Sequence, residues 1–160
     1  MAVDMFLKLD GIKGESADDK HKGEIDVLAW SWGMSQSGTT HAGTGGGAGK
    51  VSVQDVSVTK YIDKSSPPLM LACCQGAHIK SALLTVRKAG TKPLEYLKIT
   101  LEDAIITSVS TGGSGGEDRL TENLALNFAK FKVEYTPQKA DGSGDAAVEA
   151  AFDIAANKKA

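Results

Sequence analysis

The sequence predicts a mainly β fold: an antiparallel β-barrel of two packed sheets with one short flanking α-helix and a long glycine-rich loop. Three observations predict this class. Apolar side chains alternate with polar ones at the period of two that is typical of half-buried strands. Only one internal helix is clearly signalled. Ten of the 18 glycines fall into two clusters, and each cluster separates two strand-like stretches.

The clearest strand precedes the first glycine cluster. Large apolar residues occupy every second position and are expected to form core: Leu28, Trp30, Trp32 and Met34. Small residues occupy the other positions, and such a face suits close packing, a wet lumen wall or simple exposure. The two tryptophans could stack on bases or sugars, but their large apolar companions favour core or subunit packing.

Later strands change phase along the chain. Val51 and Val53 alternate, and the pattern resumes one residue out of phase after them, which predicts a bulge near Gln54 and Asp55. Further strands are expected over 83–87 and 94–109. A long strand over 120–135 shifts phase near its middle, which predicts a second bulge near Ala129 and Lys130.

One helix of about ten residues has both a start and a stop signal. Ser66 is the expected N-cap, Pro67 the first helical residue and Gly76 the C-terminal stop. The segment 146–156 is ambiguous, because its alanines favour a helix while its larger apolar residues alternate as in a strand. A length of 160 residues corresponds to a single domain over 1–160.

The charge balance argues against nucleic acid as a partner. The formal net charge is -2, and the two halves carry 8 Lys and Arg against 9 Asp and Glu, then 10 against 11. Neither half has the basic excess that phosphate backbones require. A basic patch formed only in the folded chain stays open. No apolar run approaches the roughly 20 residues of a membrane span, and we expect no signal peptide in residues 1–10.

Cysteine and histidine usage gives no metal site. Cys73 and Cys74 are the only cysteines, and adjacent cysteines bridge each other only through a strained ring. We expect two free thiols that fill core space, in a chain that folds in the cytoplasm. A metal chelate with the nearby His78 is the less favoured interpretation. His21 and His41 lie in predicted loops with no second ligand at metal-binding spacing.

No catalytic or cofactor motif is found. The first glycine cluster resembles a phosphate loop, but Thr44 and Val51 stand where a Walker A motif needs Gly and then Ser or Thr. Gly43, Gly45 and Ala48 fit a loose dinucleotide pattern, yet a strand rather than a helix follows them. We therefore expect no enzyme, no catalytic residue and no cofactor.

Two segments carry a resemblance to a known family. One is 26–38, with the sequence Asp-Val-Leu-Ala-Trp-Ser-Trp-Gly-Met-Ser-Gln-Ser-Gly. The other is 110–123, with the sequence Ser-Thr-Gly-Gly-Ser-Gly-Gly-Glu-Asp-Arg-Leu-Thr-Glu-Asn. Together with the glycine loop, the Ser-Pro helix and the length, they make the chain resemble the Hcp (haemolysin-coregulated protein) family of bacterial type VI secretion. The resemblance runs from Met1 to about Asp145. Four later residues resemble the closing strand of the family: Phe152, Asp153, Ile154 and Asn157.

This resemblance implies a structural protein: a barrel subunit of hexameric rings that stack into the inner tube of a contractile injection machine. The implied partners are further copies of the chain, the spike protein at the tube tip, the contractile sheath and effector proteins carried in the lumen. It also implies a cytoplasmic protein that is expelled with the tube, without a cleaved signal peptide. About 15 residues follow Asp145, so we expect no fused toxin domain.

Two surfaces are expected to matter in such an assembly. The small residues opposite the tryptophans are expected to border the lumen and face effectors: Ser31, Gly33 and Ser35. The glycine loop is expected to serve ring stacking: Gly38, Gly43, Gly45, Gly46, Gly47, Gly49 and Lys50. Two other functions stay open, namely a monomeric small-ligand carrier built on a closed barrel and an unrecognised hydrolase.

Overall fold

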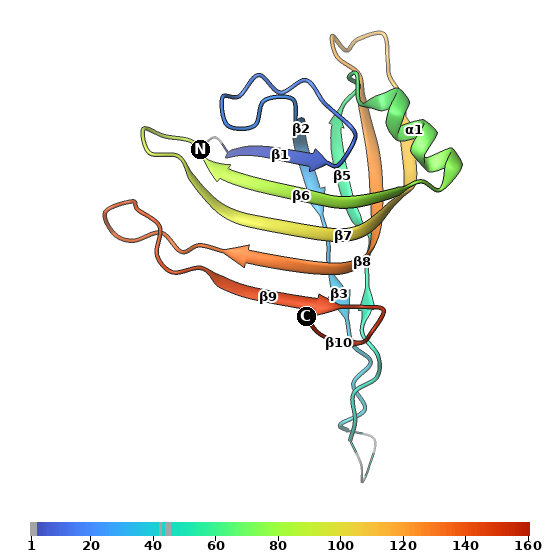
Figure 1. The fold of residues 1–160 in the computed structure, drawn as a ribbon, viewed down its shortest axis with the longest axis vertical. Helices are drawn as coiled ribbons and strands as arrows, with labels where there is room; N and C mark the ends of the chain where they lie inside the picture. The colour runs from blue at the N-terminus through green and yellow to red at the C-terminus, as the bar shows by residue number, and fades with distance from the viewer. Residues whose placement is uncertain (1–2, 42, 44–45) are drawn as a thin grey trace.

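The computed structural model describes residues 3–41, 43 and 46–160, and this part of the chain forms ten strands and one helix (Figure 1). The elements are β1 (Val3–Leu9), β2 (Ile25–Ser31), β3 (Met34–Ser35), β4 (Ser52–Val53), β5 (Val56–Tyr61), α1 (Ser66–Gln75), β6 (His78–Lys88), β7 (Leu94–Thr111), β8 (Thr121–Tyr135), β9 (Val148–Asp153) and β10 (Lys158–Lys159). The expected mainly β fold with one flanking helix is confirmed.

Six strands close into a barrel. Their order is β8-β5-β2-β1-β6-β7, and a further pairing between β7 and β8 closes the circle. All neighbouring strands are antiparallel. Because each strand pairs with the next around the whole circle, the two expected sheets are joined into one continuous sheet. The long strand β8 pairs with β5 through residues 121–126 and with β9 through residues 130–135. The barrel therefore opens at one end into a flatter extension formed by β9 and β10 (Figure 1).

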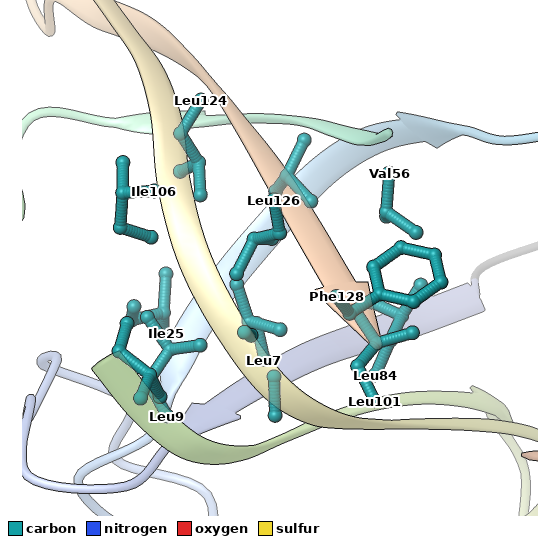
Figure 2. Close-up of a cluster of buried hydrophobic side chains, with 14 of the residues drawn as sticks. Leu7, Leu9, Ile25, Val56, Leu84, Leu101, Ile106, Leu124, Leu126 and Phe128 are labelled. Atoms are coloured by element: carbon teal, nitrogen blue, oxygen red, sulfur yellow. The ribbon is translucent and has the colours of Figure 1, made fainter. Parts of the chain in front are cut away.

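The barrel interior is filled by apolar side chains from all six strands. Figure 2 shows Leu7, Ile25, Leu84, Leu126 and Phe128 among those that point into this cluster. Each of these five side chains is at most 6% exposed. Fully burying a side chain of this size contributes roughly 1.5–3 kcal/mol. The interior is thus a packed core, as small barrels require.

One ion pair lies inside the barrel beneath α1. Lys60 on β5 and Glu122 on β8 are directly paired residues, both 0% exposed, and their Nζ and Oε1 atoms are 2.5 Å apart. Lys60 Nζ also donates to Asp63 Oδ1 at 3.0 Å, and Ser66 Oγ donates to Glu122 Oε1 at 2.5 Å. The cost of burying the charges of Lys60 and Glu122 is offset because each charge is paired with the other. The cluster thereby ties the first turn of α1 to the barrel wall.

The helix begins one residue earlier than expected. Ser65, not Ser66, is the N-cap, and Gly76 ends the helix with a left-handed φ of 59° that suits glycine. The expectation that both cysteines fill core space is wrong for Cys74, which is exposed, while Cys73 is half-buried. The reason is the helix face: Leu69 and Ala72 are the apolar residues turned inward.

Where a bulge was predicted near Gln54 and Asp55, the chain instead leaves one strand and enters another, because β4 and β5 belong to different sheets. Gln54 and Asp55 lie between these two strands. The bulge predicted near Ala129 and Lys130 is wrong, because the register between β7 and β8 is unchanged there and shifts instead between Ile106 and Ser108. The change of burial phase coincides with the point where β8 leaves β5 and begins to pair with β9.

The ambiguous C-terminal segment forms a strand. Residues 148–153 pair along their whole length with the second half of β8. Phe152 pairs with Phe131, and their ring centroids lie 6.3 Å apart. Pairing to an existing strand and burial of one aromatic side chain therefore outweigh the helix preference of the alanines.

Candidate functional site: a small polar face and a projecting arm

Four neighbouring strands present a face of small, uncharged side chains to solvent. One row of paired residues crosses the strands in the order β2, β5, β8 and β7. It consists of Ser31, Ser57, Ala125 and Ser108. A second row consists of Ala29, Thr59, Asn123 and Ser110. We call these eight residues the polar face. None carries a charge, and all are exposed or half-buried.

Hydrogen bonds order this face at two places. Thr59 Oγ1 donates to Asn123 Oδ1 at 2.6 Å. At the margin nearer the glycine loop, the carboxylate of Asp55 accepts bonds from Thr107 Oγ1 at 2.7 Å and from Asn127 Nδ2 at 2.9 Å. The acid at this margin is therefore already engaged, while several serine hydroxyls of the face make no bond within the described residues.

The sheet that carries the polar face has two unpaired edges. On the side away from β5, the pairing of β2 with β1 covers only Ile25 and Asp26. On the side away from β8, the pairing of β7 with β6 stops at Ile105. Residues 29–31 and 106–111 therefore keep backbone groups that no other described strand pairs. The helix α1 packs against β7 and so lies beside part of one of these edges. Where an edge stays uncovered, it is a template for another chain.

Only two of the four residues that were expected to form core around the tryptophans pack against it. Trp30 and Trp32 are half-buried and pack against the core, but Leu28 and Met34 are 40% and 47% exposed. The register between β2 and β5 shifts between Val27 and Ala29, so Leu28 lies in a bulge and turns outward. Met34 lies beyond the barrel in β3.

A long hairpin arm, residues 33–54, projects from the end of the barrel (Figure 1). Its two legs pair through β3 and β4 and through an isolated bridge between Gly38 and Ala48. Between 34 and 50 every described residue is exposed. Trp32 anchors its base, because its Nε1 donates to Gln54 O at 2.8 Å and its ring packs edge-on against Phe131.

Glycine is required where the two legs of the arm approach each other. A Cβ on Gly46 would lie 2.8 Å from Thr40 Cα, and one on Gly49 would collide with Ser37 Oγ. The other described loop residues singled out from the sequence are exposed along the arm: Gly38, Gly43, Gly47 and Lys50. Gly45 lies outside the described residues. Beside the arm, a groove of about 420 Å³ runs between Met34, Val53 and Phe152.

A different set of polar residues fastens the loop between β1 and β2. The ring of His21 is 2.8 Å from Glu24 Oε2 through Nδ1 and 2.6 Å from Glu95 Oε1 through Nε2. Burial raises the pKa of Glu95, but the hydrogen bond and charge of His21 outweigh it and hold that pKa below its usual value. Arg87 donates to both carboxylate oxygens of Asp18, at 2.6 and 3.0 Å, and thereby lowers the pKa of Asp18 to about 2.

These charged groups are occupied by one another and serve the fold. Across the described residues, no three His, Cys, Asp or Glu side chains lie close enough to hold a metal ion. His41 and His78 are both exposed and lie in different parts of the chain. The feature that is both open and unusual is the polar face with its two edges and the arm beside it.

Comparison with known sequences decides the family. The sequence model of the family described as "Type VI secretion system effector, Hcp" matches residues 6–135, which include the whole polar face and the arm. The chain belongs to the Hcp family. The resemblance of the two segments 26–38 and 110–123 is thereby confirmed.

Individual Hcp proteins agree in sequence and in fold. The chain is 62% identical to Protein hcp1 of Pseudomonas aeruginosa over 146 residues, which cover 91% of this chain and 90% of that protein. The crystal structure of Hcp1 from Salmonella typhimurium matches with a TM-score of 0.83 at 46% identity, over 100% of both chains. A structure described as a type six secretion system protein matches with a TM-score of 0.94 at 30% identity, over 99% of this chain and 100% of that one.

Two further findings concern the system to which the Hcp chain belongs and its relation to the membrane. It is a type VI secretion protein with a β-barrel fold. In the described part of the chain, no helix has the length and apolar character needed to cross a bilayer. The contributions of β5, β7 and β8 to the polar face were not predicted, although the alternation of Ser57 with Val58, and of Asn123 with Leu124, was a usable signal.

Proposed function

We propose that this Hcp protein is the structural subunit of the type VI secretion inner tube. Six copies form a ring, rings stack into a tube, and the tube carries effectors in its lumen and is expelled from the cell with them. The observation that carries this proposal is the polar face with an unpaired strand edge on either side. Family membership supports the coarse role, and the face supports its orientation toward the lumen.

The two edges support a ring rather than a symmetric dimer. The edge of β2 and the edge of β7 are different surfaces, so contact between them is heterologous, head to tail. A closed ring repeats that contact until each edge of every copy is covered. The polar faces of all copies then turn toward the same side of the wall, where they line a central lumen.

The chemistry of the polar face supports transient binding of varied proteins. Hydroxyl and amide groups form hydrogen bonds that can be exchanged with water or with a new partner, whereas a large apolar pocket would retain one partner tightly. Ser31 lies at the β2 end of this surface, beside Ser57. Gly33 and Ser35 continue its alternation onto the base of the arm, so we assign them to the rim of the lumen.

The arm is assigned to contacts between rings. It is bonded mainly to itself, and a chain segment that buries little of its own surface gains order from a partner. The ends of the tube offer these same surfaces to other components, which we take to be the spike protein at the tip. The outer wall of the tube faces the contractile sheath.

Native mass measurement with electron microscopy tests the proposal. The purified chain should have about six times its 16.7 kDa mass and appear as rings with an open centre. A monomer at about tens of micromolar, where assemblies of moderate affinity persist, would contradict it. That result would favour a monomeric ligand carrier, although a ligand inside the barrel would have to displace the packed core.

A further inference from the structure

A cleft of about 760 Å³ lies beside the end of β1, on a part of the surface that the tube proposal does not use. Five lysines line it: Lys8, Lys13, Lys20, Lys22 and Lys64. The chain as a whole has a net charge of -2, so this concentration of positive charge runs against its average composition. The cleft is the local basic patch that the charge balance of the sequence leaves open.

The charge of the cleft is not neutralised within the chain. Among the described residues, none of the five lysines has a carboxylate oxygen within 4.0 Å of its Nζ atom. Asp10 and Glu24 are the only acids in the lining, and Glu24 is already bound to His21. Like charges within a Debye length of about 10 Å repel one another, so a ligand of opposite charge would relieve this repulsion.

The loop that carries three of these lysines is fixed in place. It is closed by backbone bonds from Gly14 N to Gly23 O at 2.8 Å and from Gly23 N to Ser16 O at 2.9 Å. The contacts of His21 and of Asp18 described above fasten it to the barrel. Glu15 Oε2 accepts a bond from the backbone of Lys64 at 2.8 Å, which joins the loop to the opposite wall of the cleft.

The cleft lining also offers backbone donors. The amide groups of Gly11, Lys13 and Lys22 make no hydrogen bond to any described residue. Gly11 and Gly23 have φ values of 83° and 77°, which produce the turns at the two ends of the lining. Ammonium groups and free amide groups are the kinds of donor from which anion-binding sites are built.

We propose that this cleft binds a ligand with clustered phosphate groups. Its volume falls in the range of about 300–1,000 Å³ that is usual for small-molecule sites. Lysine ammonium groups bind phosphate as point charges, as the lysine of a phosphate-binding loop does. Leu9 and Ile12 are the only large apolar residues in the lining, which offers little to the side chains of an acidic peptide. The phosphates could belong to a free polyphosphate compound or to lipid headgroups.

Calorimetric titration of the purified oligomer with inorganic tripolyphosphate tests the proposal. The test variant carries Lys13→Gln, Lys20→Gln, Lys22→Gln and Lys64→Gln, changes that leave no carboxylate without its partner. The matched control carries four other exposed lysines changed in the same way: Lys92→Gln, Lys139→Gln, Lys158→Gln and Lys159→Gln. Thermal unfolding and native mass confirm that both variants stay folded and assembled.

Tripolyphosphate should bind the parent and the control, more weakly at higher salt, and at least about tenfold more weakly to the test variant. Co-sedimentation with vesicles rich in phosphoinositide distinguishes the two sources. Binding to vesicles without binding of tripolyphosphate assigns the site to headgroups and supports the phosphate chemistry. Equal affinity in all three proteins, no binding of either probe, or tighter binding of hexaglutamate than of tripolyphosphate would overturn the proposal.

Discussion

Two long connecting segments flank β2 in the chain, the loop before it and the arm after it, and different interactions hold each of them in place. The loop over 10–24 folds back onto the barrel, where His21 is 7% exposed and Ser16 4% exposed. The arm over 33–54 projects into solvent and bonds mainly to its own other leg. The loop is fastened by buried polar side chains and therefore belongs to the fold of the monomer. The arm bonds mainly to itself, so its surface is available to a second chain.

Replacing the buried histidine of the loop should give the largest loss of stability. His21→Ala leaves Glu24 and Glu95 without their shared partner in a partly buried place, which should lower the free energy of unfolding by about 2–3 kcal/mol. The matched change in the arm, His41→Ala, removes an exposed side chain and should stay within about 0.5 kcal/mol of the parent. Chemical denaturation measures both. Equal losses in the two variants would remove the distinction between loop and arm.

Trp32 should matter more to the arm than its neighbour does. Trp32→Phe keeps an aromatic ring but loses the bond from Nε1 to Gln54 O, worth about 1 kcal/mol. The arm base should then loosen and limited proteolysis within 38–50 should become faster. Trp30→Phe, which removes a similar volume and no such bond, serves as the control. Faster cleavage in both variants would show that bulk, not the bond, holds the arm.

The pH dependence of the loop follows from Asp18. Its pKa is about 2 in the folded chain against 3.8 ordinarily, so ionised Asp18 stabilises the fold fully above about pH 4. That stabilisation is lost as the pH falls toward 2. The difference in unfolding free energy between the parent and Asp18→Asn should therefore be constant near neutral pH and vanish in acid. A difference as large at pH 2 as at pH 7 would contradict this, and Asp19→Asn, an exposed neighbour, is the control.

Shortening the arm should have the smallest effect on stability and a clear effect on assembly. Replacing residues 38–49 by a two-residue turn should change the free energy of unfolding by less than about 0.5 kcal/mol, because the arm buries little. Rings should persist, but tubes seen by electron microscopy should be shorter or absent. A matched deletion of Gly115 and Gly116 in the loop after β7 should leave stacking unchanged. Normal tubes from the shortened arm would remove its assigned role.

The parts of the fold that were predictable depend on short-range patterns. Alternation located the strands, and the interruption at Gln54 and Asp55 could be read from a local change of phase. Leu28 was misplaced because a single bulge reverses which residues face inward, and the bulge leaves no composition signal. The C-terminal strand was ambiguous because pairing with β8, which decides it, is a tertiary contact.

The buried polar clusters were partly within reach. Lys60 continues the inward alternation of Val56 and Val58, and Glu122 continues that of Leu124 and Leu126, so an opposite charge on each of two inward faces was a usable signal. The contact between Arg87 and Asp18 was not, because 69 residues separate the two and only the closed barrel brings them together. The lysine cleft likewise exists only after the loop has folded back.

Recovery of bound effector tests the central claim, that the polar face lines a lumen that carries cargo. Ser31→Gln adds bulk at the β2 end of that face, and Ser81→Gln makes the same change at an exposed serine on β6, outside it. Both should give rings of normal mass. Effector that co-purifies with the parent should also co-purify with the Ser81 variant and should fall about tenfold or more with the Ser31 variant. Equal recovery from both rings would contradict the assignment of the polar face to the lumen.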